Sequence, residues 1–497
     1  MSLLAEIAQV QADISHHTKV LDGLKKRLAV LSETLHSTTA AAPASARSFS
    51  TETLPTEILS EIFSRSIPAE PNAHRPDTAP ILASVCRRWR SILLDTPAFW
   101  VPVGLVPRPA GSGFRHAANR MITFAQNAGK LPINLLLCAD LSSNPLTNDD
   151  REYFLAVLRR HAGRIGVLRM EVLLEDLGAL EGPLDGAEWE RLEKLTIVLE
   201  DMADHEEELD DGSLGCFATA PKLRSVWLEI LPPSAIKLPW SDLENFRGTY
   251  YTVSGAKHAL RLAPNLISAY LSICPEEARV PADVRLVHPR LQKLELYEEW
   301  DDDETHESRA VDYFSFPVLQ TLVIGGDSDT SLQSEQRSIG AFLAPMADSL
   351  QQLTLDKIWP SNSLPYLPLE TMHSITELRI TTPLRVTFAF DFFSEMGASG
   401  VFMRALRHLE MRIQETNKFT TTYSALGHVM PAAVRAVLWR NRDREGVAAI
   451  EVLKLVSTGY RDMVYRFEEE DVRVEGLREL KRRGVDVYVG TDTVRIV

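Results

Sequence analysis

The residues that could perform chemistry do not form a catalytic pattern in this sequence. The run HEEEL at 205–209 begins like the zinc motif HExxH but lacks its second histidine. Gly325-Gly326-Asp327 lacks the further glycines of a nucleotide-binding fingerprint, and neither a Gly-Lys-Ser phosphate loop nor a nucleophile elbow occurs. The histidines and the four cysteines show no metal-ligand spacing. We therefore expect no catalytic residues, no metal and no cofactor, and a function that depends on binding.

The composition is that of an acidic globular protein. Of 497 residues, 45% are apolar and 24% are charged, and the net charge is −15. This charge argues against nucleic acid and anionic membranes as partners, because both attract basic surfaces. No run approaches the roughly 18 consecutive apolar residues of a membrane helix, and the first residues lack the basic and apolar segments of a signal peptide. We expect a protein of the cytoplasm or the nucleus.

Apolar residues recur every seven positions at the start of the chain. The two recurring sets are Ile7, Ile14, Leu21, Leu28 and Leu35, and Leu3, Val10, Leu24 and Leu31, with His17 filling the second set. Alternating steps of four and three place both sets on one stripe of a helix, the seam of a coiled coil. We predict this helix at 1–36, where it either self-associates through residues 3–35 or folds back on its own chain. Residues 37–52, rich in Ser, Thr and Ala, are predicted to be a flexible linker.

Two helical patterns follow the linker, separated by a proline-rich stretch at 68–80. The first covers residues 54–67, with Thr53 able to cap a helix and Pro55 at the first helical position, where its missing N–H costs nothing. Its apolar residues then recur at helical spacing up to Ile67. The second pattern starts at Ile81 and predicts one amphipathic helix followed by an apolar end.

Three blocks within these patterns resemble the F-box family. They are Leu-Pro-x-Glu-Ile-Leu-x-x-Ile-Phe from Leu54, Val-Cys-Arg-x-Trp-Arg from Val85, and Asp-x-Pro-x-Phe-Trp ending at Trp100. The resemblance implies a small helical bundle at 53–102 that docks on a Skp adaptor and, through it, on the cullin ligase core of an SCF ubiquitin ligase. The heptad helix, the F-box and the repeats described below together resemble F-box families of mushroom-forming fungi.

The same resemblance assigns the adaptor-binding residues: Leu54, Pro55, Ile58, Leu59, Ile62, Val85, Cys86 and Trp89. A bundle this small leaves an apolar face that needs a partner. Cys86 is expected to be a small buried residue rather than a reactive thiol. The long proline-rich stretch departs from the typical F-box and leaves the middle helix open. The alternative is that residues 54–100 are merely the first helices that cap the following region.

From residue 165 onward a short apolar pattern recurs. Its clear copies begin at Ile165, Leu192, Leu223, Leu266, Leu291, Leu319, Leu350, Ile375, Leu406 and Ile450, with a weaker copy at Leu243. The period of about 27 residues matches leucine-rich repeats, in which a short parallel strand is followed by a return helix or loop. The predicted fold is therefore multi-part, α then α/β, with a degenerate leucine-rich-repeat solenoid at 103–497. Segments 130–137 and 484–490 are predicted end strands, and the scarcity of the usual Asn or Cys after each strand predicts irregular turns.

The variable residues beside the strand leucines should point to the concave side of such a solenoid. Exposed Trp and Tyr side chains mixed with charges are typical of recognition surfaces. The candidate target-binding residues are Trp227, Tyr270, Lys293, Glu295, Arg379 and His408, and equivalent positions hold Lys194, Glu410 and Lys454. For Trp227 and Tyr270, the alternative is that they simply cover the sheet. Acidic runs at 200–212 and 298–307 are predicted loops that either steer a basic target or are merely solvated.

These patterns predict a substrate-recognition adaptor of an SCF ligase, with an unknown protein target held on the repeats. A first alternative is an interaction scaffold whose F-box binds the adaptor without leading to degradation. Co-purification of the cullin would separate these two. A second alternative is an enzyme with an unrecognised site in the C-terminal half, which a deep polar cleft with perturbed titratable groups would favour.

Overall fold

The computed structural model describes residues 54–71, 78–106, 113–139, 148–199, 214–274, 285–298, 310–326, 334–356, 369, 371–383, 386–399, 402–414, 425–442, 446–458 and 472–491. The predicted coiled-coil helix, the linker, the HEEEL run and almost all of both acidic runs lie outside these ranges. The chain forms two compact units, Met1–Phe63 and Ser64–Val497.

Three short helices and one 3-10 turn follow the start of the described chain: α2 (Thr56–Ser66), α3 (Thr78–Val85), α4 (Arg87–Leu94) and η1 (Pro97–Trp100). Helix α2 begins one residue later than predicted, and the Pro55 carbonyl accepts the first helical hydrogen bond from the Leu59 N–H at 3.2 Å. The predicted cap Thr53 lies outside the described residues.

The prediction of one continuous helix after Ile81 is wrong. The backbone is extended at Cys86 (φ −156°, ψ 169°), and the chain restarts there as α4. The Cys86 sulfur accepts a hydrogen bond from the Trp89 N–H at 3.5 Å, so Cys86 is the N-cap of α4. The prediction that Cys86 is buried is also wrong: Cys86 lies between α3 and α4 and is exposed.

The larger unit is built on one parallel sheet. Within the described ranges, fourteen strands pair in chain order, and the two-residue strands β8 (Leu286–Val287) and β10 (Phe314–Ser315) pair separately. The strands of the sheet are β1 (Pro102–Leu105), β2 (Ile133–Ala139), β3 (Ile165–Val172), β4 (Lys194–Leu199), β5 (Ser225–Glu229), β6 (Asn245–Tyr251), β7 (Ser268–Ile273), β9 (Lys293–Glu298), β11 (Thr321–Gly326), β12 (Gln352–Asp356), β13 (Glu377–Pro383), β14 (His408–Gln414), β15 (Val452–Thr458) and β16 (Asp486–Thr491).

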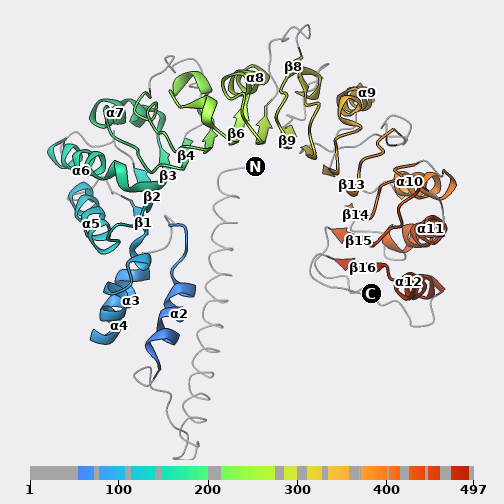
Figure 1. Cartoon of the computed structure of the whole chain (residues 1–497), viewed down its shortest axis with the longest axis horizontal. Helices are drawn as coiled ribbons and strands as arrows, with labels where there is room; N and C mark the ends of the chain where they lie inside the picture. The colour runs from blue at the N-terminus through green and yellow to red at the C-terminus, as the bar shows by residue number, and fades with distance from the viewer. Residues whose placement is uncertain are drawn as a thin grey trace, which may run out of the picture. The chain divides into compact units, whose positions relative to one another are not determined.

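Helices cover one face of this sheet (Figure 1). They are α5 (Gly113–Asn127), α6 (Asn148–His161), α7 (Leu174–Leu184), α8 (Val253–Leu262), α9 (Ser334–Leu343), α10 (Val386–Ala398), α11 (Ala425–Arg440) and α12 (Val472–Arg482). Short 3-10 turns occur at η3 (Ala162–Arg164), η4 (Pro233–Ala235), η5 (Trp240–Asp242), η6 (Ala310–Tyr313) and η7 (Ala344–Met346). The opposite face of the sheet, which we call the open face, carries no described helix of this unit.

Every predicted copy of the apolar pattern coincides with a strand of this sheet. The inward apolar residues occupy equivalent positions in adjacent strands: Leu195 is paired with Val226, and Leu353 with Leu378. All four are buried. The weak copy at Leu243 gives β6, and the predicted end strands are β2 and β16. Strand β1 was not predicted; it spans the predicted boundary between residues 102 and 103, so η1 leads into the sheet without a spacer.

Successive connections between helices and strands are linked by hydrogen bonds from side chains to backbone carbonyls. These side chains are of several types and do not form the regular ladder of Asn or Cys residues. Arg164 donates to the carbonyls of Ala125 and Leu131 at 2.6 and 3.2 Å, and the Asn265 amide donates to the Ser241 carbonyl at 2.7 Å. The Ser374 hydroxyl reaches the carbonyls of Ala347 and Leu350, both at 2.7 Å. Each donor satisfies carbonyls of a preceding turn, which a buried backbone requires. Different residue types perform the same task, which explains why the sequence shows no periodic signal there.

His288 is a titratable member of this set. It is buried, its Nε2 lies 3.1 Å from the Ala263 carbonyl, and its Nδ1 accepts a hydrogen bond from the Leu291 N–H at 3.2 Å. An accepting Nδ1 requires a neutral ring with the proton on Nε2. Burial lowers the pKa of His288, against the weaker opposing effect of the Ala263 hydrogen bond.

We therefore expect acid to destabilise the fold partly through His288. The unfolded chain binds a proton at the ordinary histidine pKa of about 6.5, whereas the folded chain does so at a lower pH. The free energy of unfolding should consequently fall as the pH drops below about 6.5. Urea unfolding followed by circular dichroism at a series of pH values should show this slope, and His288→Gln should make it shallower. An unchanged slope in the variant would refute the assignment.

Candidate functional site

Helices α2 and α3 expose apolar side chains. On α2, Ile58 and Ile62 are 48% and 45% exposed, and on α3, Ile81 and Val85 are 49% and 57% exposed. Within each helix the two residues are four positions apart and therefore share one face. Isolated exposed apolar residues are ordinary, but a stripe of them along one face of a short helix, as on α2 and on α3, is typical of a surface that binds a partner.

The other predicted adaptor-binding residues are divided between surface and interior. Pro55 and Cys86 are exposed, and Leu54 and Trp89 are half-buried. Leu59 is only 1% exposed, so its side chain belongs to the interior together with Phe63. Ile81 was missed as a surface residue, although its position four residues before Val85 was readable in the sequence.

The end of the second helical pattern is anchored to α5 by Trp100. This side chain is 4% exposed, its Nε1 donates to the Leu93 carbonyl at 2.8 Å, and its ring meets Phe124 edge-on at 5.2 Å. Beside it, Ile81 and Leu94 help to line an apolar groove of about 650 Å³ between α3, α4 and α5. Residues 78–100 are thus packed directly on the first helix of the sheet region.

The register of the parallel sheet brings the predicted target-binding residues onto one face. A central row of the open face consists of the paired residues Arg169, Thr196, Trp227, Arg247, Tyr270, Glu295, Val323, Thr354, Arg379, Glu410, Lys454 and Tyr488. Four of the predicted residues belong to this row. Lys293 and His408 lie two positions earlier in β9 and β14 and therefore share the same face.

Aromatic and cationic side chains are stacked across the middle of the central row. The Arg247 guanidinium carbon lies 4.1 Å from the ring centroid of Trp227 and 4.1 Å from that of Tyr270. The Arg169 guanidinium carbon lies 5.6 Å from the Trp227 ring centroid. Tyr297 stacks on Tyr270, with the two ring centroids 5.3 Å apart. Burial raises the pKa of Tyr297, with a further contribution from Glu295.

Arg247 and Tyr297 were not predicted as site residues. The position of Arg247 was readable, since it follows Phe246 in the weak repeat copy, but Gly248 replaces the third apolar residue and hides the pattern. Tyr297 depends on a contact in space: a Cβ at Gly325 of the neighbouring strand would lie 2.4 Å from its ring. Gly325 therefore leaves room for the Tyr297 ring, and this packing role is unrelated to a nucleotide-binding glycine motif.

A second group surrounds Glu410 near the C-terminal end of the sheet. The Glu410 side chain is only 10% exposed and lies 3.1 Å from Arg379, 2.6 Å from Arg412 and 3.9 Å from Lys454. One buried carboxylate is thus surrounded by three cations, which is the arrangement that a buried charge requires. The predicted residue His408 lies 3.7 Å from Glu451 at the surface.

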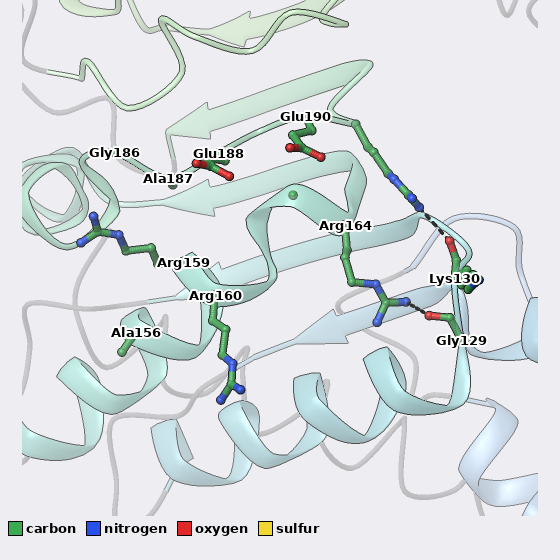
Figure 2. A pocket seen from close by; sticks show the side chains of 12 residues that line it. Gly129, Lys130, Ala156, Arg159, Arg160, Arg164, Gly186, Ala187, Glu188 and Glu190 are labelled. Carbon is green, nitrogen blue, oxygen red and sulfur yellow. Dashed lines mark hydrogen bonds between the residues drawn. The ribbon is translucent and has the colours of Figure 1, made fainter.

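A polar pocket of about 750 Å³ lies where the chain enters β2, β3 and β4. Figure 2 shows that Arg159, Arg160 and Arg164 point in different directions, so they do not converge on a common ligand. Arg164 bonds to the Gly129 carbonyl, and Arg191 donates to the Lys130 carbonyl at 2.7 Å. The residues lining the pocket include no histidine, cysteine or hydroxyl side chain. Arg164 and Arg191 act here as structural donors.

Within the described ranges, no group of three or more His, Cys, Asp or Glu side chains is arranged to hold a metal ion. No helix among the described residues has the length and apolar character needed to cross a membrane.

Comparison with known families identifies the helices before the sheet. Residues 51–103 match the sequence model of the F-box-like family. This range contains α2, α3, α4 and η1, with their exposed apolar residues and the Trp100 anchor. No curated protein matches the chain. F-box domains generally bind Skp-type adaptors, and the paired stripes on α2 and α3 suit such a role. The chain is an F-box domain-containing protein.

Proposed function

We propose that this protein is a substrate receptor of an SCF ubiquitin ligase. The observation that carries the proposal is the F-box-like match at residues 51–103, together with the exposed apolar residues of α2 and α3 inside that range. A hydrophobic surface on a small domain is stabilised when a partner covers it. In this proposal the partner is a Skp adaptor, which joins the chain to a cullin ligase core in the cytoplasm or nucleus.

The sheet region is the target-binding part of this proposal. We infer that residues 103–497 form a leucine-rich-repeat-like solenoid, since the recurring apolar pattern and the chain-order parallel pairing both support that architecture. The target is held on the open face, where aromatic and charged residues share the central row. The receptor performs no bond chemistry in this scheme; it raises the concentration of the target near the ubiquitin-transferring subunits.

The direct test is binding of a purified Skp adaptor to the full chain, measured by calorimetry. Ile58→Glu together with Val85→Glu should lower the affinity by more than about tenfold, because each places a charge on an apolar contact surface. Val318→Glu is the matched control, since Val318 is also exposed (41%) but lies in the sheet region. Circular dichroism should show that all variants are folded.

The outcomes separate the possible roles of the protein. Adaptor binding that is lost in the double variant and retained in the control supports the receptor function, provided the cullin co-purifies from an extract. Adaptor binding without the cullin would instead indicate a scaffold that does not lead to degradation. If the folded wild-type chain does not bind the adaptor, the ligase proposal fails.

A further inference from the structure

We propose that the open face at β5–β7 binds an acidic segment of the target, with a Glu or Asp carboxylate seated on Arg247. This inference rests on the proposed receptor function and specifies the chemistry of its target. The surface concerned consists of Trp227, Arg247, Tyr270 and Tyr297, which we call the arginine sandwich.

The first argument is that the protein holds the Arg247 guanidinium in place without neutralising it. The ring centroids of Trp227 and Tyr270, on the two neighbouring strands, each lie 4.1 Å from the guanidinium carbon. Stacking of this kind fixes the plane of the group, and it leaves the edge with its N–H donors available to a ligand. A fixed planar donor pair matches a carboxylate and loses little side-chain entropy when it binds.

The second argument concerns the acidic residues near the sandwich. Glu171 pairs with Arg169 at 2.8 Å, and Glu295 pairs with Lys293 at 2.7 Å. Glu229, two residues after Trp227, makes no ion pair with any described residue. Among the described residues, Arg247 likewise has no carboxylate partner, so its positive charge is uncompensated.

The third argument comes from polar atoms that lack partners. The Trp227 Nε1 and the Arg247 Nε are buried donors without an acceptor among the described residues. A buried donor without a partner typically costs about 1–3 kcal/mol. In Arg247 only Nε is cut off from solvent, so the Nη1 and Nη2 edge remains open to a ligand. Both orphan atoms are donors closed to solvent, so a ligand would be bound through the open Nη1 and Nη2 edge, whose chemistry calls for an acceptor.

A carboxylate suits this site better than a phosphate. The sandwich offers one uncompensated cation, and the neighbouring Arg169 is already paired with Glu171. One guanidinium neutralises one carboxylate, whereas a phosphate group carries a charge of about −1.5 to −2 at neutral pH. The rings of Tyr270 and Tyr297 extend the surface with apolar area for the adjoining residues of a peptide.

The test uses the full chain and short fluorescein-labelled peptides of Gly, Ser and Glu, read by fluorescence anisotropy. Counterparts with Gln or phosphoserine at the Glu positions complete the set. Because the protein carries a net charge of −15, its overall field repels acidic peptides. Tighter binding of the Glu peptide than of the Gln peptide would therefore report a local site, and that is the expected result.

Arg247→Gln should weaken binding of the Glu peptide by at least about tenfold. Arg247→Lys should restore part of the loss, because it keeps the charge but not the planar donor pair. The matched control is Arg261→Gln, which removes an equal charge from an exposed position on α8, on the helix-covered side of the sheet. This control should bind as the wild type does, and thermal unfolding should confirm that all variants are folded.

Equal binding of the Glu and Gln peptides, or equal losses in Arg247→Gln and Arg261→Gln, would overturn the proposal. A phosphoserine peptide that binds more tightly than the Glu peptide, and depends on Arg247, would overturn the carboxylate assignment. Adaptor binding by Arg247→Gln, measured in parallel, should remain intact. If the wild type binds the Glu peptide through Arg247 but fails to bind the adaptor, the receptor proposal fails while the acidic-segment site stands.

Discussion

Replacing Arg440 by methionine is expected to lower the free energy of unfolding of the C-terminal part of the sheet region by about 3 kcal/mol or more. Arg440 is 2% exposed and donates to the carbonyls of Phe402, Met403 and Ala448 at 2.8, 2.6 and 3.1 Å. Burial lowers its pKa to about 10, which leaves the guanidinium protonated at neutral pH. Methionine fills similar space but removes all of these donors. The Met403 carbonyl keeps a second hydrogen bond from the Leu406 N–H at 2.9 Å, whereas each carbonyl that stays buried without a donor costs about 1–3 kcal/mol.

The backbone near Arg440 adds a reason for a large effect. Met403 has a positive φ of 44°, a conformation that is strained for a residue with a side chain. Its carbonyl accepts hydrogen bonds from the Arg440 guanidinium and from the Leu406 N–H, at 2.6 and 2.9 Å. Loss of the Arg440 bond should therefore loosen this turn. Hydrogen exchange of the β14 and β15 amides, together with urea unfolding, would measure the change. Arg442→Met is the control, because Arg442 is exposed; equal effects of both substitutions would contradict the explanation.

Substituting Trp100 by alanine is the second large perturbation, with an expected loss of about 3–5 kcal/mol. The change removes a buried ring, its edge-on contact with Phe124 and its hydrogen bond to the Leu93 carbonyl. Trp100→Phe keeps most of the ring and should lose only about 1 kcal/mol, mainly through the hydrogen bond. Thermal unfolding of both variants would test this order.

The Trp100 variants also connect stability with function. Trp100 joins residues 78–100 to α5, so Trp100→Ala should release the α3 surface from its support and weaken adaptor binding. Leu94→Ala is a suitable control, because Leu94 is 47% exposed and its truncation should change stability by less than about 0.5 kcal/mol. Adaptor affinity that stays at the wild-type value in Trp100→Ala would show that the docking surface does not depend on this anchor.

The F-box region shows where sequence patterns were sufficient and where they were not. Three blocks with short, strict spacing identified the domain, because its helices expose and bury residues in a fixed order. The pattern did not reveal that the helix ends before Cys86. Helical spacing of apolar residues can continue through a position at which one residue is extended and a new helix begins. It also placed Leu59 at the docking surface, whereas the fold buries it.

In the sheet region, too, the sequence pattern predicted some features and not others. The spacing of the buried leucines determined the strands, their parallel order and the face on which Trp227, Tyr270 and Arg379 lie, because side chains alternate with a period of two in every strand. The spacing of apolar residues was therefore enough to show which residues share a face. Which of these residues touch depends on the folded chain: the arginine sandwich joins strands β5, β6, β7 and β9, Arg379 and Lys454 reach Glu410 from the neighbouring strands, and Arg440 of α11 reaches the carbonyls of Phe402 and Met403. Such contacts depend on side-chain conformation and on turn geometry, and neither leaves a periodic trace in the sequence.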